Sequence, residues 1–253
     1  MTPLQFGLIF AAALAAGALN AVAGGGSFFT FPTLLFVGVP PITANATNTI
    51  ALWPGVLAGM GAYRQELPKL HESLLRLGLV SLIGGGVGAY VLLHTKESTF
   101  SRMIPFLLLL ATIIFATSGP INKWLRSRKT HPLADNPWLV TLLQFIIGVY
   151  GGFFGGGIGI MMLALLAVSG MEDLNQMNAL KLVLNALING VAVVLFVLVG
   201  AILWPAALVM IVGAILGGYG GAILAQRVEQ KYVRYFVVFV GAVLTIYFFF
   251  KYW

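Results

Sequence analysis

The sequence predicts an all-α integral membrane protein made of two homologous halves. Of its 253 residues, 60% are hydrophobic and only 8% are charged, whereas a soluble domain of this size carries about 25% charged residues. Apolar stretches that approach or exceed the roughly 20 residues needed to span a bilayer recur along the chain. These stretches are continuous rather than alternating with a period of two, which argues against a transmembrane β-barrel.

The first apolar stretch, MTPLQFGLIFAAALAAGALNAVAGG, superficially resembles a signal peptide. Ala21, Val22 and Ala23 imitate a cleavage site, but the basic segment that precedes the apolar region of a signal peptide is missing. We therefore expect a retained first membrane segment.

Three consecutive glycines follow this segment in the run NAVAGGGSFFTFP, residues 20–32. Each glycine in a helix interior costs roughly 1 kcal/mol relative to alanine, so the run predicts a helix break. A second run, GVYGGFFGGGIGIMM, repeats the triplet in the other half of the chain. The predicted breaks are Gly24, Gly25 and Gly26 in the first half, and Gly155, Gly156 and Gly157 in the second.

Two further motif pairs indicate that the chain is duplicated. NATNTIALWPG from Asn45 aligns with NALKLVLNALI from Asn178, and GGGVGAY from Gly84 aligns with GGYGGAI from Gly217, both at one and the same shift. The glycine triplets repeat at nearly this shift. Three matches in the same order at nearly one spacing predict a first transmembrane repeat over 1–121 and a second over 138–253. A polar linker over 122–137 joins them.

Loop charge favours five membrane segments in each half. The segments after the glycines, 27–38 and 158–169, have about 12 residues and are short for a full crossing. With five segments per half, ten basic residues lie on one side and three on the other; with four, the division is seven and five. The positive-inside rule favours the first count, and four segments per half is the alternative.

An odd number of segments makes the two halves inverted relative to each other, as in many secondary transporters. This topology places the protein in the plasma (inner) membrane as a multi-pass protein, with the linker cytoplasmic and both termini outside. The basic residues of the loops, which give the net charge of +7, are then explained by membrane orientation rather than by binding to nucleic acid.

The paired breaks have two interpretations. Interrupted helices in transporters lie near the bilayer midplane, where unwound backbone is tolerated only if it is buried or lines a cavity, and free N–H groups at a helix start attract anions. Alternatively, the glycines allow close helix packing. The small-residue faces GGGVGAY and GAILGGYGG pack either within the chain or between two protomers of a homodimer, which the sequence leaves open.

Lys181 is the one basic residue outside the loops, and all seven acidic residues lie in or beside loops. It follows the acidic pair Glu172 and Asp173 by about 8 residues, roughly 12 Å into a helix. A lysine buried at such a depth costs about 3 kcal/mol on insertion scales. Asn178, Lys181, Asn185 and Asn189 occur at i, i+3, i+7 and i+11, so they share one helical face.

In the first half, the corresponding helix carries Asn45, Thr47, Asn48 and Thr49, with Asn48 at the position of Lys181. Neutral hydrogen-bonding groups with a single cation near two helix breaks are typical of a small-anion site. The predicted substrate-binding residues are therefore Lys181, Asn45, Thr47, Asn48, Asn178, Asn185 and the six glycines Gly24, Gly25, Gly26, Gly155, Gly156 and Gly157.

Other roles for these residues stay open. Lys181 could snorkel toward the headgroups or bind carbonyls at a broken helix end, and the asparagines could make interhelical packing contacts. We expect Ser27, Thr30 and Gln144 to be structural.

The residue inventory argues against an enzyme. The chain has no cysteine, its three histidines (His71, His94 and His131) fall in loops, and the predicted membrane segments offer no Asp or Glu. An intramembrane catalytic site, a bound metal or cofactor, and coupling through a membrane carboxylate are therefore not expected. Coordination of Na⁺ by carbonyls and hydroxyls stays open.

The runs GALNAVAGGGSFFTFPTLL, ANATNTIAL, GGFFGGGIG and NALKLVLN resemble the sulfite exporter TauE/SafE family, also called the 4-toluene sulfonate uptake permeases. The resemblance implies a bacterial or plant membrane transporter, surrounded by membrane lipid, for sulfite, sulfonates or related small organic anions. We expect export by alternating access, because an anion leaving a negative-inside cell gains about 2.3 kcal/mol per charge per 100 mV. The alternatives are a gated anion channel and a carrier of another small anion such as a carboxylate.

Overall fold

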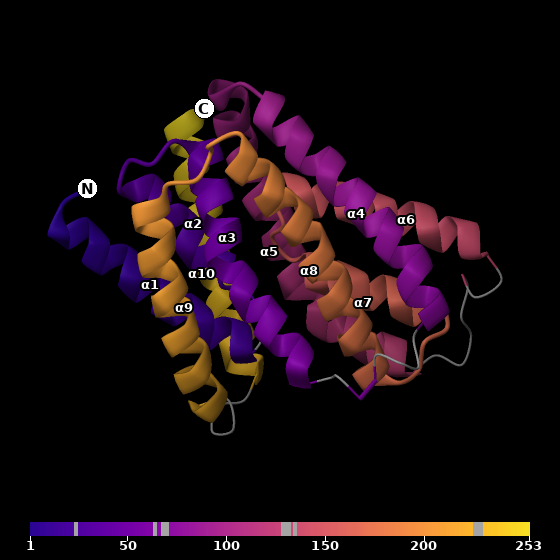
Figure 1. Ribbon diagram of the computed structural model, residues 1–253. Coiled ribbons are helices and arrows are strands. Elements are labelled where there is room, and N and C mark those ends of the chain that lie inside the picture. Colours follow the sequence, from indigo (N-terminus) through magenta and orange to yellow (C-terminus); the bar gives the residue numbers. More distant parts are fainter. Residues whose placement is uncertain (23–24, 63–64, 67–70, 128–132, 134–135, 225–229) are drawn as a thin grey trace.

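The computed structural model describes residues 1–22, 25–62, 65–66, 71–127, 133, 136–224 and 230–253. Within these residues the chain forms ten helices and no strand (Figure 1). The helices are α1 (Pro3–Val22), α2 (Ser27–Phe36), α3 (Pro41–Ala62), α4 (His71–His94), α5 (Glu97–Ser127), α6 (Pro137–Phe153), α7 (Ile158–Val168), α8 (Leu174–Leu198), α9 (Trp204–Leu224) and α10 (Gln230–Tyr252).

Five of these helices are long and apolar enough to cross a bilayer, namely α1, α4, α5, α8 and α10. Shorter apolar helices are α2, α6, α7 and α9. With 10 and 11 residues, α2 and α7 are each about 15 Å long, half the thickness of the hydrocarbon core. The prediction of an all-α integral membrane protein is confirmed, and the protein is multi-pass.

The helices follow the spacing of the motifs. α2 and α7 begin at Ser27 and Ile158, each directly after its glycine run. The next three helices of the first half, α3, α4 and α5, precede α8, α9 and α10 respectively by one constant interval, which is the shift that aligns the motifs. Each half therefore consists of five corresponding helices. α5 continues through residues 122–127, so the first part of the predicted linker is helical.

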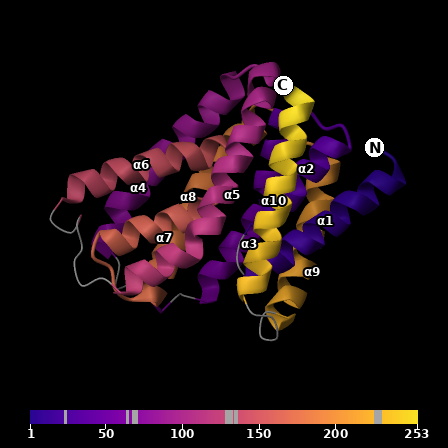
Figure 2. The same ribbon diagram turned by 180° about the vertical axis from the view of Figure 1, so that it is seen from behind.

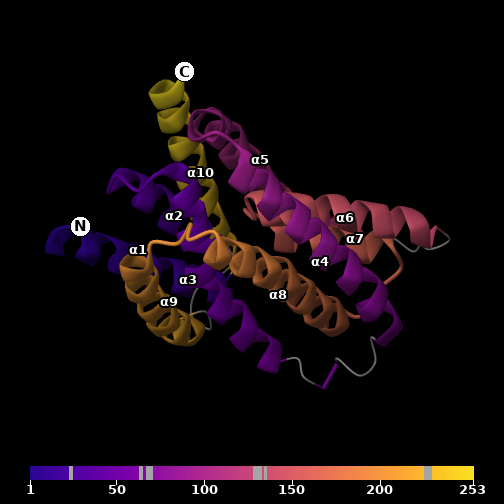
Figure 3. The same cartoon turned by 45° about the horizontal axis from the view of Figure 1, so that its top comes forward.

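Helix pairing interleaves the two halves. α1 packs mainly on α9, and its counterpart α6 packs mainly on α4, the counterpart of α9. α3 contacts its own counterpart α8, and α5 contacts α10. In two opposite views, α1 and α6 run toward the centre from opposite sides of the molecule (Figures 1 and 2), and a tilted view shows α3 beside α8 between them (Figure 3). The helices of each half are therefore buried largely by helices of the other half.

Glycines bring the backbones of these pairs into contact. A Cβ atom at Gly88 of α4 would overlap the carbonyl oxygen of Val149 in α6, and one at Gly217 of α9 would overlap the carbonyl oxygen of Leu14 in α1. The two small-residue faces that the sequence left without an assigned partner therefore pack inside one chain.

We predict that Gly88→Ala destabilises the protein by about 1–3 kcal/mol, because the added methyl group forces α4 and α6 apart. Gly86→Ala is the matched control on the same helix, since its Cβ would meet only a Val191 methyl group at 3.7 Å. Both substitutions gain about the same helix propensity. Thermal unfolding in detergent measures the difference, and equal melting temperatures would contradict the packing described here.

The helix breaks occur where the glycines predict them. α1 ends at Val22 and α2 begins at Ser27, while α6 ends at Phe153 and α7 begins at Ile158. Gly25, Gly155 and Gly157 have φ angles of 93°, 81° and 79°, in the left-handed region that side chains disfavour. The helices on either side of each break pack on each other, so the chain turns back at both. Gly24 lies outside the described residues.

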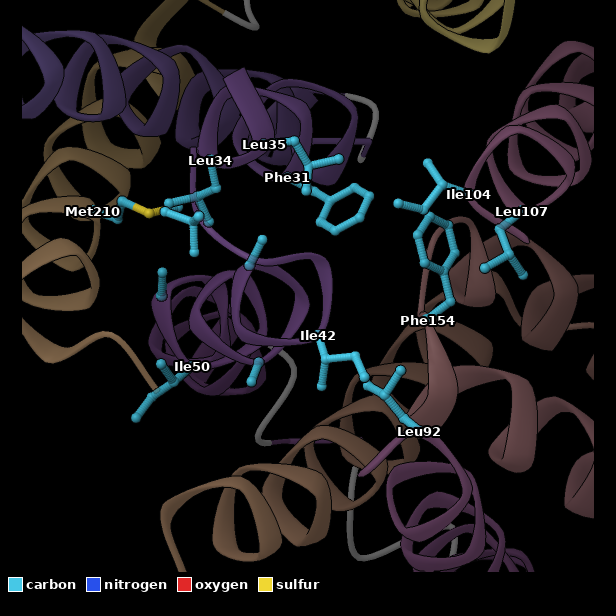
Figure 4. Close-up of a cluster of buried hydrophobic side chains, with 14 of the residues drawn as sticks. Phe31, Leu34, Leu35, Ile42, Ile50, Leu92, Ile104, Leu107, Phe154 and Met210 are labelled. Atoms are coloured by element: carbon cyan, nitrogen blue, oxygen red, sulfur yellow. The ribbon is translucent and has the colours of Figure 1, made fainter. Parts of the chain in front are cut away.

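Buried apolar side chains form two clusters. The larger surrounds α2 and α3 and includes Phe31, Leu34 and Phe154 (Figure 4). The smaller surrounds α7 and α8 and includes Met162 and Leu165. By the shift that aligns the two glycine triplets, Met162 and Leu165 are the counterparts of Phe31 and Leu34. The two clusters are thus partly equivalent packings, one built around each hairpin.

Candidate functional site

A cavity of about 1520 Å³ lies between the two helix breaks. Gly25 lines it from the first break, and Gly155, Gly156 and Gly157 line it from the second. It extends to Met171 and Glu172 in the connection between α7 and α8. At the opposite end of the helices lie the connections between α2 and α3 (37–40), α4 and α5 (95–96), and α8 and α9 (199–203). None of these connections contributes a lining residue. The cavity therefore reaches one end of the helical assembly only.

The predicted polar face of α8 lines this cavity. Asn178, Lys181, Asn185 and Asn189 are all lining residues, and Asn48 faces the same space from α3. The remainder of the lining is largely apolar and includes Phe28, Phe115, Leu163 and Leu182. Helical periodicity predicted that the four polar side chains of α8 lie together, because an α-helix returns to the same face every three to four residues.

Lys181 is held at the start of α7. Its Nζ donates a hydrogen bond to Asn178 Oδ1 at 2.8 Å. Asn178 in turn donates through Nδ2 to the carbonyl oxygen of Leu174, also at 2.8 Å, which fixes the amide orientation. Cδ of Lys181 lies 3.6 Å from the place a Cβ would take at Gly159, in the first turn of α7. An ammonium has three donors, and the described residues use one.

The second break lines the same cavity and contributes backbone N–H groups. The amides of Phe154 and Gly155 donate to Tyr150 O, at 2.9 and 3.1 Å, and the amide of Ile158 donates to Gly155 O at 3.4 Å. The described residues supply no acceptor for the amides of Gly156 and Gly157. Free N–H groups and the positive end of a helix dipole attract anions. The positive charge of Lys181 and the free N–H groups at the start of α7 therefore both favour an anion in the cavity.

The first break is closed by its own hydrogen bonds. The amide of Gly26 donates to Asn20 Oδ1 at 2.8 Å. Thr30 Oγ1 donates to Asn48 Oδ1, and Asn48 Nδ2 donates to Ser27 Oγ at 3.4 Å. These contacts occupy most of the polar groups at the start of α2.

The second half has no equivalent network among its described residues. The counterparts of Ser27 and Thr30 are the apolar Ile158 and Met161, and the counterpart of Asn48 is Lys181. The two breaks are therefore chemically unequal, and the unpaired donors lie in the second half.

Three predicted site residues lie elsewhere. Asn45, Thr47 and Gly26 do not line the cavity. Asn45 Nδ2 donates to the carbonyl oxygen of Phe153 at 3.1 Å, at the end of α6. Thr47 Oγ1 accepts from the amide of Leu203 at 3.0 Å, just before α9. These two buried side chains join α3 to neighbouring segments through Asn45 Nδ2 and Thr47 Oγ1. The buried Oδ1 of Asn45 has no hydrogen-bond partner among the described residues.

Asn20 and Trp53 are lining residues that make hydrogen bonds and that the sequence did not predict. Asn20 lines the cavity and caps the amide of Gly26; its place as a polar residue in the first glycine run was a usable signal. Trp53 lines the cavity and donates through Nε1 to the carbonyl oxygen of Ala186 at 3.1 Å, a contact that no sequence pattern indicates. Gln144 lies away from the cavity, where its Nε2 donates to Ser81 Oγ at 2.8 Å.

The profile of the family described as sulfite exporter TauE/SafE matches residues 9–248. The chain belongs to the sulfite exporter TauE/SafE family. Its TauE/SafE relatives include the probable membrane transporter protein YfcA of Escherichia coli K12, which is 28% identical over 97% of this chain and 90% of the relative. A probable membrane transporter protein of Haemophilus influenzae is 31% identical over 94% of this chain and 92% of the relative.

A third TauE/SafE relative, the probable membrane transporter protein ORF9 of Sinorhizobium sp, is 31% identical over 97% of this chain and 94% of the relative. No solved structure matches the chain. The family match over nearly the whole sequence, together with these relatives, establishes a membrane transporter of the TauE/SafE family.

Proposed function

We propose that this transporter exports small anions, such as sulfite, sulfonates or related organic anions, by alternating access. The observation that carries the proposal is the position of Lys181, whose ammonium group shares a cavity with the free amides at the start of α7. A cation and free N–H donors that line one cavity complement an anionic group. The family name, which refers to sulfite, supports the substrate class.

In the proposed complex, Lys181 neutralises the anion and the amides of Gly156 and Gly157 bind its oxygen atoms. Asn185 offers a further hydrogen bond from the same face of α8, and Asn48 offers one from the facing helix α3. Asn189 supports Asn185, because its Nδ2 donates to Asn185 O and Oδ1 at 3.0 and 2.6 Å. The apolar part of the lining contacts the remainder of an organic anion. Binding is reversible because no covalent chemistry is required of the site.

Alternating access is supported by the unequal ends of the cavity. Phe154 lines the cavity, and its ring lies edge-on to that of Phe31, with centroids 5.6 Å apart and an interplanar angle of 85°. Phe31 is 1% exposed and belongs to the larger apolar cluster (Figure 4). This ring pair therefore stands between the site and the packed end of the molecule. We propose that the two halves, related as inverted repeats, rock to open one end while closing the other.

The proposed orientation places the open end of the cavity in the cytoplasm. Leu133, in the predicted basic linker, donates through its amide to Val168 O at the end of α7, beside the connection where the cavity opens, and basic loops face the cytoplasm. An anion that binds from the cytoplasm then leaves down the membrane potential, which supplies about 2.3 kcal/mol per charge per 100 mV. Export therefore needs no coupling ion.

Counterflow in liposomes tests this function. We predict that vesicles containing the purified protein and loaded with unlabelled sulfite accumulate labelled sulfite transiently, because a carrier returns loaded faster than empty. Sulfoacetate, taurine, sulfate and small carboxylates inside the vesicles identify which anions the carrier exchanges. Vesicles with the Lys181→Gln variant are the control.

Two outcomes would contradict the proposal. Flux that is rapid, does not saturate and shows no counterflow indicates a gated anion channel. Absence of movement for every anion of the panel contradicts the substrate class.

A further inference from the structure

We propose that the cavity selects anions with a single negative charge over dianions of the same shape. This inference rests on the proposed function, because it concerns the same cavity and the same lysine. It specifies the charge of the transported species, which neither the family nor the names of the relatives state.

The charges of the lining carry the inference. Among the described residues that line the cavity, Lys181 is the one basic residue and Glu172 the one acidic residue. Glu172 is exposed and lies in the connection between α7 and α8, where the cavity meets the end of the molecule. The other polar side chains of the described lining are neutral amides, hydroxyls and an indole, among them Asn20, Asn48 and Asn185.

A single ammonium group compensates one negative charge. The second charge of a dianion would face amide dipoles and apolar side chains such as Phe28 and Leu163. A charge removed from water without a partner is strongly disfavoured.

The internal repeat shows where a second cation could stand. Asn48 and Lys181 occupy corresponding positions on α3 and α8, which pack on each other, and both line the cavity. Two lysines at these positions would make a site for a dianion. In this chain the first-half position is a neutral amide whose Oδ1 accepts from Thr30. The duplicated site therefore contains one positive charge where its architecture provides two positions.

Methylphosphonate and methanesulfonate test the selection, because both are tetrahedral and similar in size. Methylphosphonate changes from a monoanion to a dianion between about pH 6 and about pH 9, as a phosphate group does near neutrality, whereas methanesulfonate stays a monoanion. We expect calorimetric titration of the wild-type protein to show methylphosphonate binding at least about tenfold more weakly at the higher pH. The affinity for methanesulfonate at the two pH values shows any change in the protein itself. The loss of affinity for methylphosphonate is measured relative to the affinity for methanesulfonate at the same pH.

The converse test adds a second cation. Asn48→Lys is expected to raise the affinity for dianionic methylphosphonate and sulfate at least about tenfold relative to methanesulfonate. Because Asn48 also bonds to Ser27 and Thr30, Asn185→Lys provides a second variant that leaves these contacts intact.

The outcomes separate this inference from the proposed function. Binding of methanesulfonate together with an equally strong binding of the methylphosphonate dianion in the wild type overturns the selection and leaves the anion site in place. Binding of no anion at either pH overturns both.

Discussion

Lys181→Gln is expected to weaken anion binding at least about a hundredfold, which corresponds to about 2.7 kcal/mol. A hydrogen bond to a charged group contributes about 1.5–3 kcal/mol, and the variant also loses the Coulomb attraction in a partly apolar cavity. Calorimetric titration with sulfite and methanesulfonate measures the loss. Asn178, which fixes the ammonium in the wild type at 2.8 Å, can still bond to the glutamine amide, so the local geometry is preserved.

The same substitution has the opposite effect on stability. An ammonium group at this depth costs about 3 kcal/mol on insertion scales, and glutamine removes that cost. We therefore expect the ligand-free variant to unfold at the same or a higher temperature than the wild type, while the stabilisation caused by added anion disappears. A lysine kept for packing would give the reverse pattern, with lower stability and unchanged binding.

Lys96→Gln is the matched control, because Lys96 is exposed in the connection between α4 and α5, outside the cavity. It makes the same change in net charge and should leave anion binding unaltered. Full affinity in both Lys181→Gln and Lys181→Ala would contradict a role for this lysine in the site. The snorkelling alternative would then be the better interpretation.

The sequence predicted those features that depend on local chemistry. Consecutive glycines lower helix propensity, and both predicted breaks occur at their glycine runs. A third triplet, Gly84 to Gly86, continues inside α4, so glycine content alone does not end a helix. The face shared by Asn178, Lys181 and Asn185 followed from helical periodicity. The duplication was predicted because several motifs kept one spacing, and the starts of α3, α4 and α5 precede those of α8, α9 and α10 by the same spacing.

The rest depended on partners that are distant in sequence. Asn45 and Thr47 were predicted to bind substrate, and the structure pairs Asn45 Nδ2 with Phe153 and Thr47 Oγ1 with Leu203, 108 and 156 residues away. A buried amide or hydroxyl must be satisfied, and only the tertiary structure tells whether a protein group or a ligand satisfies it. In the same way, a small-residue face indicates close packing without specifying the partner helix, so the pairing of Gly88 with Val149 could not be foreseen.

The last prediction concerns the ring pair that separates the cavity from the packed end of the molecule. Phe31→Ala is expected to favour the state in which the cavity opens at that end. Replacing a buried phenylalanine with alanine destabilises the packing around it by about 3–5 kcal/mol. This destabilisation applies to the state described here, in which Phe31 is 1% exposed. The chain has no cysteine, so a single reporter can be added without background.

Leu163→Cys places that reporter in the lining of the cavity. In the otherwise unchanged protein, a membrane-impermeant thiol reagent should label it from the side where the cavity opens, and vesicles of the two orientations distinguish the sides. With Phe31→Ala added, labelling from the opposite side should rise at least about tenfold, because several kcal/mol no longer favour the closed end. Leu34→Cys, which is 0% exposed and outside the cavity lining, shows how far the packed end itself opens.

Met162→Ala is the matched control for this experiment. Met162 is the counterpart of Phe31 in the second half and is equally buried, in the smaller cluster around α7 and α8. If the two clusters close opposite ends in turn, loss of packing in the second half should not increase labelling of Leu163→Cys from the packed side. An equal increase for both variants would indicate general loosening of the helices, and no increase for Phe31→Ala would show that the ring pair does not close the cavity. An increase confined to Phe31→Ala would mean that the two clusters, related by the internal repeat, control opposite ends of one anion pathway.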